Sequence, residues 1–313
     1  MAAGLTLSAC GGSDDGGSGG SGGGEGETVS GAVVIDGSST VEPLSSAAAE
    51  LFMEENPDAN VTVGTSGTGG GFEKFCAGET DISDASRPIK DSEIAICKEN
   101  NIAYTELLVG NDALSVVVNN ENDWANCLTV EQLKKIWEPD SKVKNWNQVD
   151  PSFPNEPLEL FGAGSDSGTF DYFTEKVNGE EGASRTDYNP TEDDNVTVQG
   201  VSATKGALGY FGYSYLEANA DKLKAVEIDG GGGCVAPSAE TAQDQSYTPL
   251  FRPLFIYVSD AGLKKPQVVS FAEFYLENNP DIVEVAKFIP LTDDQIKTAQ
   301  SELADLKSKA GSK

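Results

Sequence analysis

The hydrophobic and polar positions follow one pattern in three separate segments of the chain. Short apolar runs at residues 32–35, 61–63 and 158–161 predict buried strands. Each run is followed by a loop of glycine and hydroxyl residues: GSST, GTSGTGGG and GAGSDSGT. Apolar residues at helical spacing come next, and in the first segment they are Val41, Leu44, Ala48 and Leu51. The pattern therefore predicts an α/β protein that contains three strand–loop–helix units.

Loops of this composition favour anion binding at the helix ends that they precede. The first N–H groups of a helix lack intrahelical acceptors, and the aligned peptide dipoles place partial positive charge there. Glycine lets an oxyanion approach the backbone closely, and Ser or Thr adds an O–H donor. A single residue such as Ser39, Thr68 or Ser167 fits a simple helix cap equally well. Three loops in one chain instead predict a shared pocket for a tetrahedral oxyanion.

A fourth segment, ETDISDASRPIK at residues 79–90, contains one of only three arginines in the chain. The guanidinium of Arg87 offers a planar fork of donors that matches two oxygens of a phosphate group. The alternative is a surface ion pair between Arg87 and Asp84 or a glutamate. We expect Arg87 to supply the positive charge of the pocket.

Several motifs together resemble those of the phosphate-binding proteins of bacterial ABC importers, the PstS family. They are DGSSTVEPL, GTSGTGGGFEKFCAGETDISDASRPIK, GSDSGTFDYF and ATKGALGYFGYSYL, in the family's order and covering roughly residues 31–313. The resemblance implies a two-lobe periplasmic-binding-protein-like fold of type II. In this fold, two hinge crossings join the lobes and the ligand lies in the cleft between them.

The resemblance also implies which residues contact phosphate. Some family members carry an arginine where this chain has Ala163, and Arg87 looks like its substitute. The expected phosphate-binding residues are Ser39, Thr40, Ser66, Thr68, Asp84, Ser86, Arg87, Ser167, Gly168 and Thr169.

In that set, Asp84 is the residue expected to accept the proton of bound phosphate, with Asp81 or Ser86 as alternatives. Phosphate at neutral pH still carries a P–OH donor whereas sulfate carries none. A group that only accepts hydrogen bonds therefore favours phosphate and disfavours sulfate.

Two long apolar segments, residues 107–120 and 247–258, are the expected crossings between the lobes. One lobe is then expected to comprise residues 31–110 and 250–313, and the other residues 111–249. The segments SFAEFYLENN and 292–310 predict amphipathic helices packed on the first lobe.

The N-terminal residues resemble a bacterial lipobox, in which a cysteine is lipidated after signal cleavage. Leu7, Ser8 and Ala9 precede Cys10, so residues 1–10 are expected to be the remnant of a lipoprotein signal. The positively charged start of a signal peptide is missing, so we expect translation to begin further upstream. Residues 11–30 are rich in Gly and Ser and predict a flexible tether. The expected location is the outer face of the cytoplasmic membrane, with the lipid as the sole membrane contact.

The four remaining cysteines, Cys76, Cys97, Cys127 and Cys234, form an even number in an export context. Three pairings are possible, and four free thiols are a further alternative. We favour Cys76–Cys97 and Cys127–Cys234, because each pair then lies within one expected lobe. The cysteines include no C-x-x-C pair and the chain has no histidine, so we expect no metal site.

The formal charge of −30 argues against nucleic acid as a partner. It also requires an anion receptor to bind through local groups. Without histidine the Ser–His–Asp arrangement is excluded, and GTSGTGGG lacks the Lys-Ser/Thr of a phosphate-binding P-loop. We expect a monomeric receptor without catalytic activity or cofactor, which captures inorganic phosphate for an ABC permease. A surface phosphate sensor, a receptor for another tetraoxyanion and a metal-dependent phosphatase are the alternatives.

Overall fold

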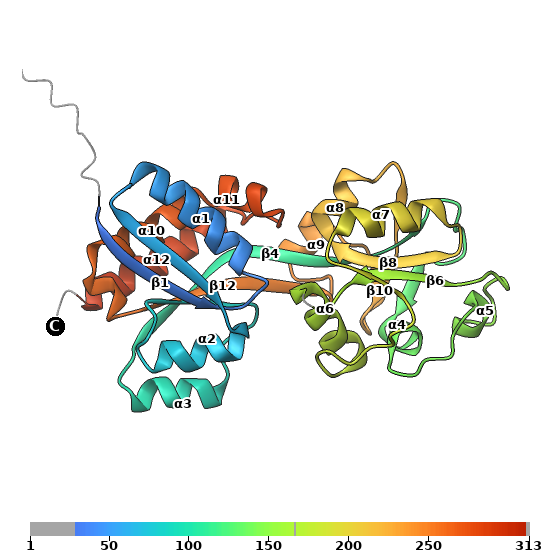
Figure 1. Cartoon of the computed structure of the whole chain (residues 1–313), viewed down its shortest axis with the longest axis horizontal. Helices are drawn as coiled ribbons and strands as arrows, with labels where there is room; N and C mark the ends of the chain where they lie inside the picture. Colours follow the sequence, from blue (N-terminus) through green and yellow to red (C-terminus); the bar gives the residue numbers. More distant parts are fainter. Residues whose placement is uncertain (1–28, 166, 311–313) are drawn as a thin grey trace, which may run out of the picture.

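A computed structural model describes residues 29–165 and 167–310, which fold into two lobes side by side. Two long strands, β4 (Tyr104–Asn119) and β12 (Phe251–Ser259), run between the lobes (Figure 1). In this part of the chain the main sheet has nine strands, in the order β2-β1-β3-β12-β4-β8-β6-β7 with β9 paired to β4. The predicted α/β class and two-lobe architecture are confirmed.

The first lobe has three parallel strands, and its helices cover both faces of the sheet. The strands are β1 (Gly31–Gly37), β2 (Ala59–Thr65) and β3 (Ile82–Ala85). The helices are α1 (Glu42–Glu55), α2 (Gly67–Cys76), α3 (Asp91–Glu99), α10 (Pro266–Glu277), α11 (Asn279–Ala286) and α12 (Asp293–Ala310), with a short 3₁₀ turn, η2, at Gly262–Lys264.

Strand alternation divides the core of this lobe between the two faces. In β12, Leu254 and Ile256 pack with α1, α10 and α12, whereas Phe255 and Tyr257 pack with α2 and α3. The predicted helices at SFAEFYLENN and 292–310 correspond to α10 and α12, and both contribute to the first of these cores.

The second lobe is built around the far half of β4 and the parallel strands β6, β7 and β8. Its strands are β5 (Cys127–Thr129), β6 (Glu159–Ala163), β7 (Asn189–Thr191), β8 (Ala207–Gly212), β9 (Leu223–Ala225), β10 (Glu227–Asp229) and β11 (Cys234–Val235). Its helices are α4 (Val130–Trp137), α5 (Trp146–Val149), α6 (Gly168–Phe173), the π-helical turn η1 (Thr174–Asn178), α7 (Asp194–Ala203), α8 (Tyr213–Ala218) and α9 (Ala239–Gln243).

The hydrophobic cores change from one lobe to the other within the crossing strands. Along β4, Leu107 and Val109 belong to a core of the first lobe, whereas Ala113 and Leu114 belong to a core of the second. One later residue departs from the expected division of the chain. Ile289 follows α11, pairs with Asn111 and packs into the core of the second lobe. The exact lobe boundaries remain a prediction.

All three predicted strand–loop–helix units are present. They are β1–α1, β2–α2 and β6–α6. Because β1, β2 and β3 are parallel, the loops after them lie at the same edge of the first lobe's sheet. No helix in the described part of the chain has the length and apolar content needed to cross a bilayer. Cys10 and the expected tether up to residue 28 lie outside the described residues.

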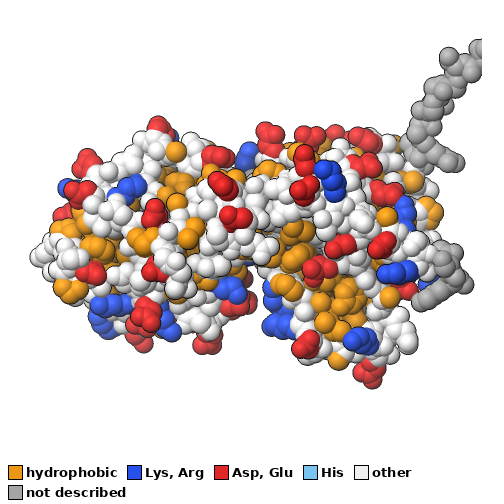
Figure 2. Space-filling view, turned by 180° about the vertical axis from the view of Figure 1, so that it is seen from behind, with side chains coloured by type: hydrophobic (Ala, Val, Ile, Leu, Met, Phe, Trp, Pro, Cys, Tyr) orange, Lys and Arg blue, Asp and Glu red, His pale blue; other side chains and the backbone are white. Residues whose placement is uncertain are grey.

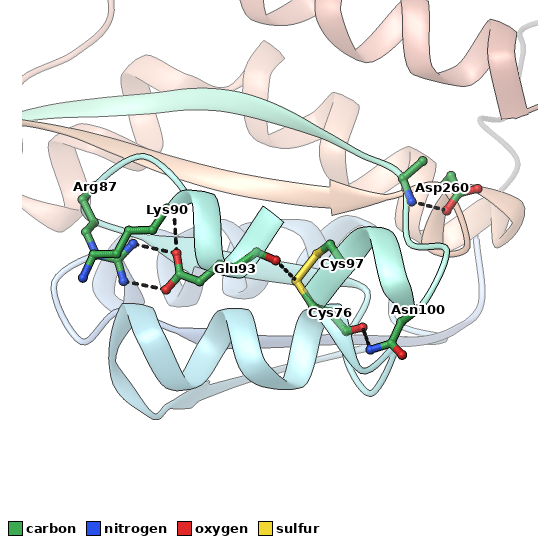
Figure 3. Close-up of a disulfide and its surroundings, with 8 residues drawn as sticks. Cys76, Arg87, Lys90, Glu93, Cys97, Asn100 and Asp260 are labelled. Carbon is green, nitrogen blue, oxygen red and sulfur yellow. Dashed lines mark hydrogen bonds and ion pairs between the residues drawn. A yellow bond between two sulfur atoms is a disulfide. The ribbon is translucent and has the colours of Figure 1, made fainter. Parts of the chain in front are cut away.

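Both favoured disulfides, Cys76–Cys97 and Cys127–Cys234, are present. The first joins the end of α2 to α3, as Figure 3 shows, and closes a separation of 21 residues. The second joins β5 to β11 and closes a separation of 107 residues. A cross-link restricts the unfolded chain more strongly when its loop is longer.

We predict that replacing either cysteine pair with alanine lowers the free energy of unfolding. The loop-entropy relation gives about 3 kcal/mol for Cys76–Cys97 and about 5 kcal/mol for Cys127–Cys234. Urea unfolding of the two double variants and the wild type measures both losses. A loss under about 1 kcal/mol for either pair would contradict the expected constraint.

Candidate functional site

A cavity of about 540 Å³ lies between the two lobes. Figure 2 shows a notch between the lobes with Lys and Arg side chains on both of its flanks. The residues that line the cavity come from both lobes and from one crossing strand: Ser38, Ser39, Thr40, Ser66, Gly67, Thr68, Gly69, Ser86, Arg87, Lys90, Gly168, Asp171, Tyr172, Glu175, Lys176, Glu181 and Arg252.

The first turn, residues 38–40, connects β1 to α1. The Ser38 carbonyl accepts hydrogen bonds from the backbone N–H groups of Val41 and Glu42, at 3.1 and 3.0 Å. Ser38 Oγ accepts a bond from Thr40 N at 3.2 Å. Within the described residues, the hydroxyls of Ser39 and Thr40 make no hydrogen bond of their own. Both residues line the cavity, so these hydroxyls are available to a ligand.

The second turn lies at the start of α2, which begins at Gly67. Gly67 has a φ of +74°, in the left-handed region that favours glycine. Thr68 Oγ1 accepts a bond from Ser86 N at 3.2 Å and lies 3.1 Å from Ser86 Oγ. This pair joins the second turn to the segment after β3. Ser66, beside them, donates its hydroxyl to Asp36.

Arg87 lies on the cavity wall and is paired with Glu93 of α3 (Figure 3). Its Nη1 and Nη2 donate to the two Glu93 oxygens at 2.9 and 2.8 Å, and its Cζ lies 5.7 Å from the centre of the Phe72 ring. Burial alone would raise the pKa of Glu93, but hydrogen bonds from Arg87 and from Lys90 N lower it below its usual value. The ion pair that was the alternative role for Arg87 is thus present, and it orients the guanidinium on the wall.

The third turn meets the first across the cleft at Gly168. A Cβ atom on Gly168 would lie 2.5 Å from Thr40 Oγ1 and 3.1 Å from Ser39 Oγ. Only glycine permits this approach. Ser167 does not line the described cavity. Its Oγ caps α6 by accepting a bond from Thr169 N at 3.1 Å. Thr169 is absent from the described lining as well.

Arg252 is a cavity residue that the sequence patterns did not single out. It lies on β12 opposite Asp112 of β4, and 3% of its surface is exposed. Its Nε donates to Asp112 Oδ2 at 2.8 Å, and its Nη2 lies 2.8 Å from the same oxygen as part of the ion pair. Its Nη1 donates to the Gly168 carbonyl at 3.3 Å. The only sequence signal for Arg252 is the rarity of arginine in this chain.

Asp84, the expected proton acceptor, does not line the described cavity. Side chains alternate along β3, and Asp84 faces α1 with Ile82. Its Oδ1 accepts a bond from Ser45 Oγ at 2.8 Å, and its Oδ2 has no partner among the described residues. Burial raises the pKa of Asp84 to about 8, Ser45 opposes the rise, and Glu42 and Asp36 add to it. A carboxyl that is protonated at neutral pH is not an acceptor-only group.

The two alternatives to Asp84 lie in different places. Asp81 is at the opposite end of β3, where it binds Lys265 Nζ at 2.9 and 3.2 Å. Ser86 lines the cavity. Of the ten expected site residues, seven line the described cavity, namely Ser39, Thr40, Ser66, Thr68, Ser86, Arg87 and Gly168.

The charge of the cavity lining differs from that of the whole chain. Four cationic residues, Arg87, Lys90, Lys176 and Arg252, face three acidic residues, Asp171, Glu175 and Glu181. Burial raises the pKa of Asp171, Glu181 adds to this, and Arg252 opposes it. The lining residues alone carry a slightly positive formal charge, but Glu93 and Asp112 pair with two of these cations from behind. In a chain of formal charge −30, a small anion must therefore be held by the local N–H and O–H donors of the lining.

Comparison with known proteins gives consistent matches. The family model described as a PBP superfamily domain matches residues 23–279. The phosphate-binding protein PstS of Staphylococcus saprophyticus is 42% identical over 315 residues, which cover 100% of this chain and 94% of that protein. Protein SphX of Synechococcus elongatus is 49% identical over 262 residues, which cover 83% and 77% of the two chains. The crystal structure of a possible phosphate binding protein from Planctomyces limnophilus is 49% identical, with a TM-score of 0.85, and the match covers 89% of this chain and 99% of that one.

We predict that Asp84→Asn changes how stability depends on pH. A raised native-state pKa means that the folded protein retains a proton which the unfolded chain releases. The retained proton of Asp84 adds to the free energy of unfolding in full below about pH 4, and this stabilisation is lost as the pH rises towards 8. The variant should gain stability relative to the wild type by about 1 kcal/mol per pH unit across that window.

Urea unfolding of both proteins at pH 5, 6, 7 and 8 measures the difference. The exposed residue Asp58, replaced by Asn, corrects for the removal of one negative charge from the chain. A constant difference between wild type and Asp84→Asn from pH 5 to pH 8 would show that Asp84 is ionised in the folded protein.

Proposed function

Because the chain belongs to the PBP superfamily and, within it, to the PstS family of phosphate-binding proteins, we propose that it captures inorganic phosphate for import by an ABC transporter. Proteins of this family are substrate-binding components of such transporters and not enzymes. The observation that carries the proposal is the cavity between the lobes, where hydroxyl and glycine turns from both lobes meet two arginines.

The proposed ligands are the hydroxyls of Ser39, Thr40, Thr68 and Ser86, with the guanidinium of Arg87. Hydrogen bonds to a charged group contribute about 1.5–3 kcal/mol each. A micromolar dissociation constant requires about 8 kcal/mol in total. A handful of these donors is therefore sufficient, even after the cost of closing the lobes.

Four other residues of the expected phosphate-binding set are proposed to shape the site without contacting phosphate through their side chains. Gly168 allows α6 to approach Thr40. Ser167 and Thr169 shape the start of α6, and Ser66 supports the second turn.

We propose Asp171 in place of Asp84 as the acceptor of the phosphate proton. Asp171 lines the cavity and lies three residues after Gly168, so both are on one face of α6. A carboxylate at this place would accept the P–OH hydrogen of phosphate and repel sulfate, which has no proton to donate.

Delivery to a permease requires the protein to remain near the membrane. We propose that Cys10 carries a lipid at the outer face of the cytoplasmic membrane and that residues 11–30 form the tether. The proposed partners are inorganic phosphate and the permease subunits. The receptor is proposed to act as a monomer.

Titration calorimetry of residues 27–313 with phosphate and with sulfate tests the proposed function. We expect phosphate to bind with micromolar or tighter affinity and sulfate to bind at least a hundredfold more weakly. Asp171→Asn should reduce the difference between the phosphate and sulfate affinities, because the amide can donate a hydrogen bond to sulfate. If phosphate produces no binding heat and no rise in the unfolding midpoint, the proposed function is wrong.

Arg87→Ala should weaken phosphate binding at least tenfold, because it removes a charge-assisted donor from the wall. Lys74→Ala, which removes a cation that pairs with Asp36 outside the cavity, is the control. Equal affinity of Arg87→Ala and Lys74→Ala would remove Arg87 from the site.

A further inference from the structure

Arg252 combines near-complete burial with a place on the cavity lining. It lies on a strand that runs between the lobes, and its Cζ lies 4.4 Å from the centre of the Tyr172 ring. Tyr172 in turn donates its hydroxyl to the Pro249 carbonyl at 2.9 Å, just before this strand. The guanidinium of Arg252 is thus held against the second lobe, at the floor of the cleft.

The hydrogen bonds of Arg252 leave part of its guanidinium available. An arginine carries five N–H groups. Among the described residues, Nε donates to Asp112 Oδ2 and Nη1 donates to the Gly168 carbonyl at the long distance of 3.3 Å, while Nη2 lies 2.8 Å from Asp112 Oδ2. At least one N–H group on each terminal nitrogen is therefore left for a ligand in the cavity.

Stability alone gives a weak reason for a buried pair of this kind. Desolvation of two charges offsets most of their attraction, and apolar replacements of buried ion pairs are often neutral or stabilising. Asp112 holds one edge of the guanidinium through a single oxygen, because Nε donates to Oδ2 and Nη2 lies 2.8 Å from that oxygen. Such a pair does supply an oriented positive charge, which an anion pocket in an acidic chain requires.

We propose that Arg252 is a second anion-binding arginine, which donates to the tetrahedral ligand from the floor of the cleft, and that Asp112 is its positioning residue. The inference rests on the proposed function, since it concerns the same cavity. Arg87 holds the ligand from the wall of the first lobe. Arg252 holds it from the crossing strand and, through the Gly168 carbonyl, links it to the third turn.

The small number of arginines permits a test on the wild-type protein. The chain has three, so the arginine Nε–H region of a ¹⁵N-correlated NMR spectrum should contain three signals. These can be assigned with the single variants Arg87→Lys, Arg185→Lys and Arg252→Lys. Arg185 is the internal control, because its partners are Asp187 and the carbonyls of Ile136 and Val143, away from the cavity.

On addition of inorganic phosphate, we expect the signals of Arg87 and Arg252 to move and that of Arg185 to stay. An unmoved Arg252 signal at saturating phosphate, with the Arg87 signal shifted, would overturn the inference. If phosphate moves none of the signals and gives no calorimetric heat, the proposed function itself fails, so the two failures are distinguishable.

Binding of phosphate to variants provides the second arm. The double variant Asp112→Asn/Arg252→Gln removes both charges and leaves no unpaired buried ion, and we expect it to weaken phosphate binding at least tenfold. Lys265→Gln, which removes one exposed cation of the first lobe outside the cavity, should stay within twofold of the wild type. A folded double variant with wild-type affinity would overturn the inference.

Two further variants separate binding from folding. Arg252→Lys keeps the positive charge but loses the planar set of guanidinium donors, so it should bind phosphate with an affinity between those of the wild type and the double variant. If the double variant does not fold, Arg252→Lys tests the role of Arg252 in its place. Asp112→Asn should shift the Arg252 Nε–H signal before any phosphate is added, as expected of a positioning residue. Wild-type affinity in Arg252→Lys together with an unmoved Arg252 signal on phosphate addition would count against the proposal.

Discussion

The long-range field of a chain with a formal charge of −30 opposes the approach of any anion. Binding must therefore come from groups within hydrogen-bond distance, in a place where the local charge differs from that of the surface. The cavity between the lobes meets this requirement with neutral donors and with two arginines, each paired to one carboxylate. Each carboxylate holds its guanidinium in place while leaving N–H groups for a ligand.

The two-lobe fold brings these groups together. Parallel strands place the first and second turns at one edge of a sheet, and β6–α6 presents the third turn from the other lobe. The two lobes meet at one point of the cleft, where Gly168 of the second lobe lies against Thr40 of the first. Beside the crossing strands, the segment after α11 reaches from the first lobe to the second, where Ser214 and Gln243 bind the carbonyls of Lys287 and Pro290. Movement of the lobes therefore involves this segment as well as β4 and β12.

Local sequence patterns predicted much of the fold and part of the candidate site. The strand–loop–helix units and both cysteine pairs could be predicted because each depends on a short motif or on a few alternatives. Arg252 could not, because its place depends on the register of two strands 140 residues apart in sequence. The orientation of Asp84 depends on strand alternation, where a shift of one residue changes the face of the sheet. Asp171, which we propose as the acceptor, lies within the motif GSDSGTFDYF but after its glycine and hydroxyl loop, and only the fold shows that it lines the cavity.

In the proposed complex, one tetrahedral anion lies between the lobes and contacts groups from both. A crystal structure of the protein grown in the presence of phosphate would show whether this complex forms. We expect a single tetrahedral density within hydrogen-bond distance of Thr40, Thr68, Ser86 and both Arg87 and Arg252, next to the start of α6. Phosphate bound only on the outer surface of either lobe, with the cleft filled by water, would contradict it.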